Sequence, residues 1–171
     1  MTKNTEPKKW NLISILKEVL TVIVLVFILS NIISYIRKPE LGSTQLPHIK
    51  AQLLDDSMFS VEEGKPLIVH FWAVWCPTCK LEAPNIEAVS KEFNVLTIAV
   101  NSGSDKKLQG YMKEHDLSFK VLNDNEGTWA KRFKVEAFPT TFVYDAKGEL
   151  RFTEVGYTTT AGLLARLEWI E

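Results

Sequence analysis

The sequence predicts an α/β domain whose mixed β-sheet is flanked by helices, preceded by an N-terminal transmembrane helix. Three observations predict this organisation. Residues 19–36 form an uncharged apolar run. From about residue 48, strand-like and helix-like segments alternate and then end in a strand hairpin and a helix, an order typical of a mixed sheet covered on both faces. Finally, the two cysteines of the chain, Cys76 and Cys79, stand where a buried strand gives way to a helix.

The apolar run VLTVIVLVFILSNIISYI contains 18 residues without a charge. As a helix it would be about 27 Å long, close to the thickness of the hydrocarbon core of a bilayer. No A-x-A cleavage pattern follows it, which favours an uncleaved anchor over a signal peptide. The run also lacks the polar periodicity of a helix from a soluble protein. We therefore expect a cytoplasmic stub at 1–14, a transmembrane anchor at 15–37, a linker at 38–47 and a folded domain at 48–171.

Charge is distributed unevenly along the chain. Before Pro39 there are six Lys or Arg residues and two acids, whereas the remainder has 14 Lys or Arg against 19 Asp or Glu. An acidic domain without clustered basic residues does not indicate a nucleic-acid partner. Basic residues are more frequent before the apolar run than after it, which favours a cytoplasmic N-terminus and an extracytoplasmic domain.

The elements of the domain follow from apolar patterning and from turn residues. A short hairpin is expected first, and the second hairpin is marked by the turn sequence DAKG. Pro84 lies inside the first predicted helix of the domain, where it is expected to kink the helix. The predicted strands are 49–54, 57–61, 67–72, 95–100, 119–122, 140–144 and 150–155. The predicted helices are 77–93, 105–115, 127–133 and 159–170.

The position of Cys76 at the start of a helix favours redox chemistry. Pro77 occupies the position where proline suits a helix start, so the Cys76 sulfur would face unpaired backbone N–H groups and the positive end of the helix dipole. Both favour a thiolate. Cys79 lies on the same helix face and can close a disulfide with Cys76. We expect Cys76 to attack a substrate and Cys79 to resolve the mixed disulfide.

Other uses of two cysteines are less consistent with the sequence. A zinc site would need two further ligands, and His48, His70 and His115 show no paired spacing. A purely structural disulfide this short would constrain the unfolded chain very little. A pair of inert thiols is the third alternative. Because the sulfur pair can carry the electrons itself, we expect neither a metal nor an organic cofactor.

At three separate places the sequence resembles thioredoxin-like proteins. The segment FWAVWCPTCKLEAP resembles their active site, with Trp75 before the first cysteine. The segment VEAFPTTFVYDAKG is similar to the loop that carries the family's cis-proline, here Pro139, and Gly156 in EVGY matches a glycine beside the active site. The inserted segment SGSDKKLQGYMKEHDLSFKVLND, the N-terminal hairpin, the anchor and Glu82 resemble the TlpA/ResA/DsbE branch. Within it, the chain looks most like membrane-anchored bacterial disulfide oxidoreductases of the suppressor-for-copper-sensitivity D type.

This resemblance implies a thiol–disulfide oxidoreductase attached to the bacterial inner membrane by a single span, with its domain in the periplasm or another extracytoplasmic space. Its substrates would be protein thiols and disulfides, and its electron donor or acceptor another membrane thiol–disulfide protein. Reductases of cytochrome c maturation share the sequence WCPTC but carry Glu after the cis-proline, where this chain has Thr140. A dedicated role in cytochrome c maturation remains an alternative, and so does a copper-binding module that uses both cysteines.

The residues around the cysteines are expected to hold the substrate. Proline has no N–H, so Pro139 would leave the backbone of Phe138 free to pair with an extended substrate strand. The further residues expected to contact substrate are Trp75, Pro77, Thr78, Thr140 and Gly156.

Two titratable residues could handle the proton of Cys79. Glu82 follows Cys79 on the same predicted helix face and could relay a proton through water, or it could be a solvated acid favoured by the helix dipole. His70 stands on the preceding strand, where thioredoxin has a buried Asp. It could accept the Cys79 proton or be a hydrogen-bonded core histidine.

Overall fold

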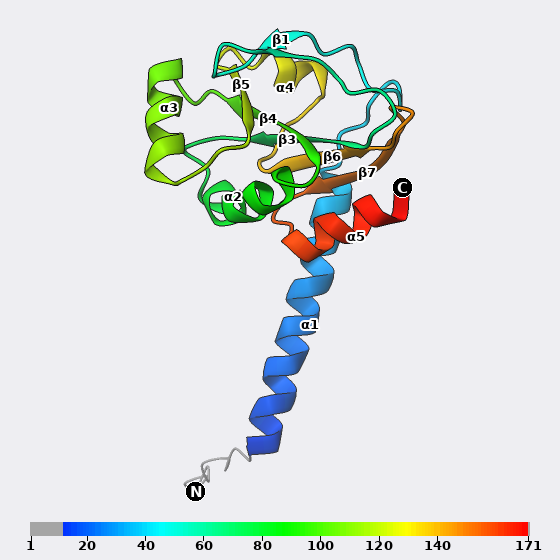
Figure 1. Cartoon of the computed structure of the whole chain (residues 1–171). Coiled ribbons are helices and arrows are strands. Elements are labelled where there is room, and N and C mark those ends of the chain that lie inside the picture. Colours follow the sequence, from blue (N-terminus) through cyan, green and yellow to red (C-terminus); the bar gives the residue numbers. More distant parts are fainter. Residues whose placement is uncertain (1–11, 171) are drawn as a thin grey trace, which may run out of the picture. The chain divides into compact units, whose positions relative to one another are not determined.

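A long helix, α1 (Leu12–Ile36), precedes the sheet-containing part of the chain (Figure 1). The structure is a computed structural model and describes residues 12–170. The 23-residue segment Ser14–Ile36 is long and apolar enough to cross a membrane, and nearly all of its side chains are exposed. This agrees with the position of the predicted anchor. Residues 1–11 of the predicted stub lie outside the described residues.

The following part of the chain, residues 37–170, contains a five-stranded sheet in the order β5-β4-β3-β6-β7. The strands are β3 (Leu67–Trp72), β4 (Asn94–Val100), β5 (Lys120–Asp124), β6 (Thr140–Tyr144) and β7 (Leu150–Val155). Strands β4 and β5 continue the sheet in parallel to β3, whereas β6 pairs antiparallel with β3 and β7 antiparallel with β6. The sheet is therefore mixed, and β3, which leads to the cysteines, is its central strand.

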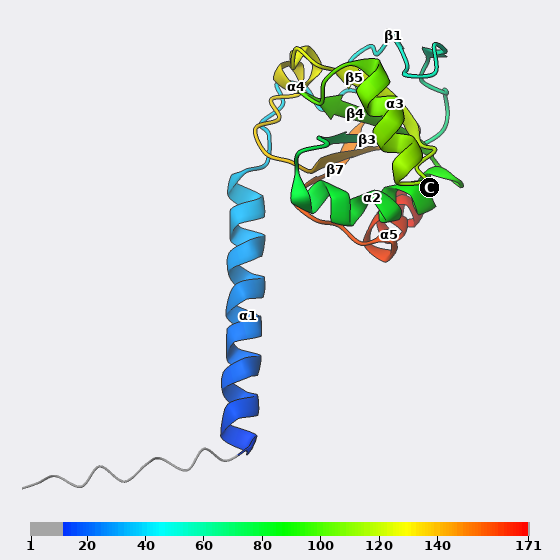
Figure 2. The same cartoon turned by 90° about the vertical axis from the view of Figure 1, so that its left-hand side faces the viewer.

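Helices cover both faces of this sheet, as predicted. One face packs against α2 (Pro77–Ser90), α3 (Asp105–Glu114) and α5 (Thr160–Ile170) through a core that also contains both cysteines. The other face packs against α4 (Thr128–Arg132) and the hairpin of β1 (Ala51–Gln52) and β2 (Met58–Phe59). Figure 2 shows α2 and α5 on one side of the sheet and α4 with β1 on the other.

Side-chain alternation along β3 decides which residues lie near the cysteines. Ile68 and Trp72 belong to the core cluster that contains Cys76 and Cys79, whereas Val69 and Phe71 belong to the cluster on the opposite face. Because side chains alternate between the two faces of a strand, His70 points to the same face as the cysteines.

Most of the predicted elements are confirmed, with boundaries shifted by a few residues. The N-terminal hairpin is shorter than predicted, since only two residue pairs connect its strands. The inserted segment, residues 102–124, forms α3 and the edge strand β5. Pro84 lies inside α2, as expected from the sequence.

The predicted boundary between linker and domain needs a correction. Thr44 O accepts a hydrogen bond from Leu150 N, and Leu46 N donates to Gly148 O. Gln45 forms an isolated antiparallel bridge with Glu149. The last residues of the predicted linker are therefore part of the domain, because they pair with the start of β7 and the turn before it.

Candidate active site

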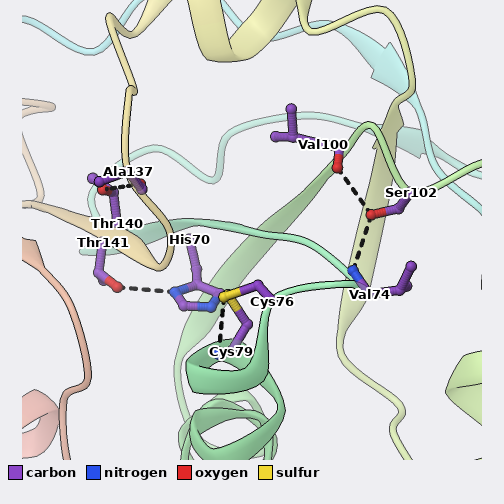
Figure 3. Close-up of a disulfide and its surroundings, with 9 residues drawn as sticks. All are labelled: His70, Val74, Cys76, Cys79, Val100, Ser102, Ala137, Thr140 and Thr141. Carbon is purple, nitrogen blue, oxygen red and sulfur yellow. Dashed lines mark hydrogen bonds between the residues drawn. A yellow bond between two sulfur atoms is a disulfide. The ribbon is translucent and has the colours of Figure 1, made fainter.

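The two cysteines lie at the junction of the central strand and α2, and they form a disulfide (Figure 3). Their Cα atoms are 5.3 Å apart. Cys76 is the N-cap residue of α2 and Pro77 is the first residue of the helix, which confirms the predicted position. A cysteine pair at this spacing can alternate between a disulfide and two thiols.

The Cys76 sulfur already receives a hydrogen bond from the helix start. Its Sγ accepts from the backbone N of Cys79 at 3.2 Å. A reduced sulfur at the same place would be stabilised as a thiolate by this donor and by the positive end of the helix dipole. In the oxidised state both cysteines are buried, with exposed fractions of 5% for Cys76 and 2% for Cys79.

The loop before Cys76 is fastened to the end of β4. Ser102 is fully buried, and its hydroxyl accepts from Val74 N at 3.1 Å and donates to Val100 O at 3.0 Å (Figure 3). The indole Nε1 of Trp75 donates to Asn101 O at 3.1 Å. Sequence reasoning missed Ser102 and Asn101, because their contacts join segments about 26 to 28 residues apart.

A second loop, before β6, brings Pro139 to the site. The Phe138–Pro139 peptide bond is cis, as expected. The Trp75 and Phe138 rings meet edge to face with centroids 5.7 Å apart. The Gly156 backbone N donates to Pro139 O at 2.8 Å. The cysteine loop, the proline loop and the glycine, predicted from three separate motifs, are therefore linked by direct contacts.

The residues expected to contact substrate differ in their exposure. Trp75 has an exposed fraction of 55%, Pro77 is exposed, and Thr78 and Phe138 are half-buried. Pro139 and Thr140 are buried, and the Thr140 hydroxyl donates to Ala137 O at 2.8 Å. The Thr140 side chain therefore supports the proline loop from within, and its contact with a substrate stays a prediction.

Glu82 is fully buried, so the alternative of a solvated acid is wrong. Its Oε1 accepts from Thr158 N at 3.0 Å. Its Oε2 has no hydrogen-bond partner among residues 12–170. Burial raises the pKa of Glu82 to about 8, against a smaller lowering by the bond from Thr158. The buried Glu82 side chain is thus mainly protonated at neutral pH.

Asn85, one turn further along α2, was not singled out from the sequence. Its Nδ2 donates to Thr158 O and to the Tyr157 hydroxyl, and its Oδ1 accepts from the Thr160 hydroxyl. Together with Glu82 it ties α2 to the segment after β7. That segment follows Gly156, which contacts Pro139, so α2 and the proline loop are coupled through it.

His70 is buried and bonded within the sheet. Its Nδ1 lies 2.9 Å from the Thr141 hydroxyl of the neighbouring strand β6. Burial lowers the pKa of His70 to about 3, so the imidazole is neutral at physiological pH. A neutral imidazole with so low a pKa is a weak base, which argues against the predicted transfer of the Cys79 proton to His70.

No group of three or more His, Cys, Asp or Glu side chains suited to a metal ion occurs within the described range 12–170.

A disulfide at the N-terminus of a helix that follows the central strand of a five-stranded mixed sheet, with a cis-proline just before a neighbouring strand, defines the thioredoxin-like class of protein. Residues 43–153 match the AhpC/TSA family. This match covers well over half of the chain, and the chain therefore belongs to the AhpC/TSA family.

Similar proteins include thiol–disulfide oxidoreductases. A thioredoxin-like protein from Haemophilus influenzae is 29% identical over 161 residues, which cover 92% of this chain and 95% of that protein. Sporulation thiol-disulfide oxidoreductase A from Bacillus subtilis is 31% identical over 116 residues, 64% of this chain and 68% of that protein. The exposed lipoprotein thioredoxin of Streptococcus pneumoniae has a similar structure, with a TM-score of 0.65, 25% identity, and coverage of 72% of this chain and 99% of that chain. The protein is accordingly an enzyme of the thiol–disulfide oxidoreductase class.

Proposed function

We propose that this protein is a membrane-anchored enzyme that exchanges electrons with protein cysteines through Cys76 and Cys79. One observation carries the proposal: the Cys76 sulfur caps α2, receives the N–H of Cys79, and lies within disulfide reach of the Cys79 sulfur. The same sulfur can therefore be stabilised as a nucleophile and then be released by its neighbour.

The reaction moves two electrons between two disulfides. In the reducing direction, the Cys76 thiolate attacks a substrate disulfide, and one substrate sulfur leaves as a thiolate. The Cys79 thiolate then attacks the Cys76 sulfur of the mixed disulfide. This step closes the Cys76–Cys79 bond, releases the second substrate thiolate and leaves the substrate reduced. The same steps in reverse oxidise a substrate dithiol.

We assign the proton of Cys79 to the ionised form of Glu82, which is the minor form at pH 7 and reaches about half near pH 8, rather than to His70. Glu82 follows Cys79 by about one turn of α2, and both side chains are buried. Its pKa of about 8 lies close to the value near 8.5 of an ordinary thiol, so transfer between the two groups is nearly balanced. Its free oxygen Oε2 is available to a water that bridges to the sulfur.

The substrate would lie across the loops that meet at the disulfide. Phe138 and Pro139 form one side, Trp75 and Pro77 the other, and Thr78 and Gly156 border the same region. Both rings of the Trp75–Phe138 contact are at least partly exposed. An extended polypeptide could pair with the backbone of Phe138 while its cysteine reaches Cys76.

The proposed location is the outer side of a bacterial inner membrane. The length and composition of α1 support a single membrane span, and the basic residues before it favour a cytoplasmic N-terminus. The similar pneumococcal protein is described as an exposed lipoprotein, which agrees with an extracytoplasmic domain. A second thiol–disulfide protein of the membrane would supply or remove the electrons.

The assignment of the two cysteines predicts a trapped intermediate. Replacing Cys79 with Ser removes the resolving thiol, so Cys76 should accumulate as a mixed disulfide with substrate proteins. Non-reducing electrophoresis of the full-length Cys79→Ser variant should show bands of higher mass that disappear when a thiol reductant is added. The Cys76→Ser variant is the matched control and should form none. If the Cys76→Ser variant forms these species and the Cys79→Ser variant does not, the two roles are reversed.

A further inference from the structure

A buried polar pair, His70 and Thr141, joins β3 and β6 beside the disulfide. The two residues are register partners in the antiparallel ladder, and both are buried. Their side chains occupy the sheet face of Ile68 and Val143, which belong to the same core cluster as the cysteines. In Figure 3, Nδ1 of His70 is directed to Thr141, and the opposite edge of the ring is directed toward the cysteine pair.

The hydrogen bond between these residues determines which imidazole nitrogen carries the proton. Within the described chain, residues 12–170, Nδ1 is the one hydrogen-bond partner of the Thr141 hydroxyl. If Nδ1 accepts, the hydroxyl hydrogen is satisfied and the proton of a neutral imidazole sits on Nε2. If Nδ1 instead donates, the hydroxyl hydrogen is left without an acceptor in the core, which costs free energy. The first arrangement is therefore favoured.

The two sulfurs differ in the donors available to them. The Cys76 sulfur accepts from the Cys79 backbone, whereas the Cys79 sulfur accepts no hydrogen bond from any residue in 12–170. Cys79 is also the more deeply buried of the two. A thiolate that forms there during resolution needs a donor from the core, because water has little access to it.

We propose that Thr141 holds His70 in the Nε2–H tautomer, so that His70 donates a hydrogen bond to the Cys79 sulfur of the reduced site. Thr141 is then a positioning residue for thiol–disulfide exchange, and His70 stabilises charge without moving a proton. The low pKa of the buried imidazole is consistent with this role, since the ring stays neutral. This inference rests on the proposed function and deepens it, because it assigns the donor of the Cys79 thiolate.

The donor would favour the reduced enzyme. Stabilising the Cys79 thiolate leaves the electron and proton count of the exchange unchanged: the ionised form of Glu82 takes the proton of Cys79, Cys79 attacks the Cys76 sulfur, and the substrate thiolate leaves. Losing the donor should raise the pKa of the Cys79 thiol and make the disulfide harder to reduce.

Two variants of the full-length chain in detergent separate this role from packing. Thr141→Val keeps the shape of the side chain and removes the hydroxyl, whereas Thr141→Ser keeps the hydroxyl. We expect Thr141→Val to slow release of a mixed disulfide at pH 7 by about threefold to tenfold, as for one lost hydrogen bond. It should also raise the pKa of the Cys79 thiol, measured by alkylation rates, and Thr141→Ser should restore both.

The tautomer is read directly from the nitrogen-15 shifts of His70 in the reduced, unsubstituted chain, which needs no variant to fold. Protonation at Nε2 supports the proposal, and protonation at Nδ1 overturns it. Unchanged release and an unchanged thiol pKa in a folded Thr141→Val variant also overturn it. Insulin reduction by the unsubstituted chain measures the proposed function separately. A chain that reduces insulin but carries the Nδ1–H tautomer therefore refutes the Thr141 proposal alone.

Discussion

At the scale of single residues, the proposed site includes titratable groups that the fold removes from water. Glu82 and His70 both lie in the core, and desolvation favours the neutral form of each. The neutral forms differ in what they offer to a sulfur. A protonated carboxyl can exchange its proton near neutral pH, whereas the neutral imidazole offers a fixed N–H donor.

The buried carboxyl of Glu82 predicts a pH-dependent stability. In the folded chain Glu82 keeps its proton up to about pH 8, while in the unfolded chain it ionises near its ordinary value of 4.5. Between these values unfolding releases a proton, so the free energy of unfolding falls as the pH rises. The full difference corresponds to at most about 5 kcal/mol. Because buried His70 takes up a proton on unfolding below about pH 6.5, which offsets the Glu82 effect there, urea unfolding of the oxidised chain should show this fall between about pH 6.5 and 8, and Glu82→Gln should flatten it.

Glu87 on the same helix provides a control, because its pKa is shifted in the opposite direction from that of Glu82. Desolvation raises the pKa of Glu87, but hydrogen bonds from Ser118 and Phe119 outweigh it and lower the pKa overall. The stability that Glu87 contributes is present above its ordinary pKa and is lost as the pH falls. Glu87→Gln should therefore change the acid side of the profile. A fall between about pH 6.5 and 8 that survives in Glu82→Gln would refute the burial argument.

The sequence predicts some of these residues better than others. Cys76, Cys79 and Pro139 belong to short motifs whose geometry is local, and their places are confirmed. The burial of Glu82 is not local, because the segment that covers it follows 76 positions later in the chain. An acidic residue near the start of a helix is ordinarily solvated, and no pattern in the residues around Glu82 predicts its contact with Thr158.

At the scale of elements, the loop that carries the cysteines is held by contacts to a second loop. The segment after β4 supplies the hydroxyl of Ser102 and the carbonyl of Asn101, which bind the backbone of Val74 and the ring of Trp75. This segment opens the insertion that distinguishes the chain from thioredoxin itself. Hence the insertion adds an edge strand to the sheet and also contributes to the site.

Removing the Ser102 hydroxyl should loosen this loop. Ser102→Ala leaves the Val74 N–H and the Val100 carbonyl without their side-chain partner in a buried place, at a cost of about 1–3 kcal/mol. We expect a lower urea midpoint and also a changed reduction potential, measured against glutathione, since the loop positions Cys76.

Ser104→Ala is the matched control, because Ser104 caps α3 at an exposed position and its hydroxyl accepts from Lys107 N within that helix. It should lower stability by about 1 kcal/mol and leave the reduction potential unchanged. Equal shifts of the potential in both variants would show that Ser102 acts through overall stability alone.

Element boundaries were predictable where the pattern is local. The strand before the cysteines, the second hairpin and the closing helix follow from apolar runs and turn residues, and they are confirmed within a few residues. The first hairpin shortens because a turn, closed by Leu53 N donating to Ser57 O, occupies part of it. The missed pairing of residues 44–46 with the start of β7 joins distant parts of the chain, which no local pattern reveals.

At the scale of the whole molecule, the chain divides into two units, and the proposed anchor would place the first of them in lipid. Of the described residues, 12–36 belong to one unit and 37–170 to the other. The helix of the first exposes apolar side chains along its length, as expected for a segment surrounded by lipid. The second unit has its own core and carries every residue assigned to the site. We therefore expect the redox activity to persist when the helix of the first unit is removed.

This separation predicts how the chain partitions. As a helix, Ser14–Ile36 is about 35 Å long, enough for the hydrocarbon core. Membranes containing the full-length protein should therefore retain it after carbonate washing. A fragment of residues 38–171 should be soluble and should reduce insulin as fast as the full-length chain in detergent. Release of the full-length protein by carbonate would contradict the anchor.

A shorter fragment of residues 48–171 tests where the domain begins. It lacks the hydrogen bonds that Thr44 and Leu46 make with Leu150 and Gly148, and it lacks the contacts of Leu41 and Leu46 with the core. Its free energy of unfolding should be lower than that of fragment 38–171 by about 2 kcal/mol or more, because two hydrogen bonds and part of an apolar surface are lost. The disulfide lies at the other end of β3, so the reduction potential should not change. Equal stability of the two fragments would mean that residues 44–46 belong to the linker after all. A changed reduction potential would mean that this segment also supports the disulfide site.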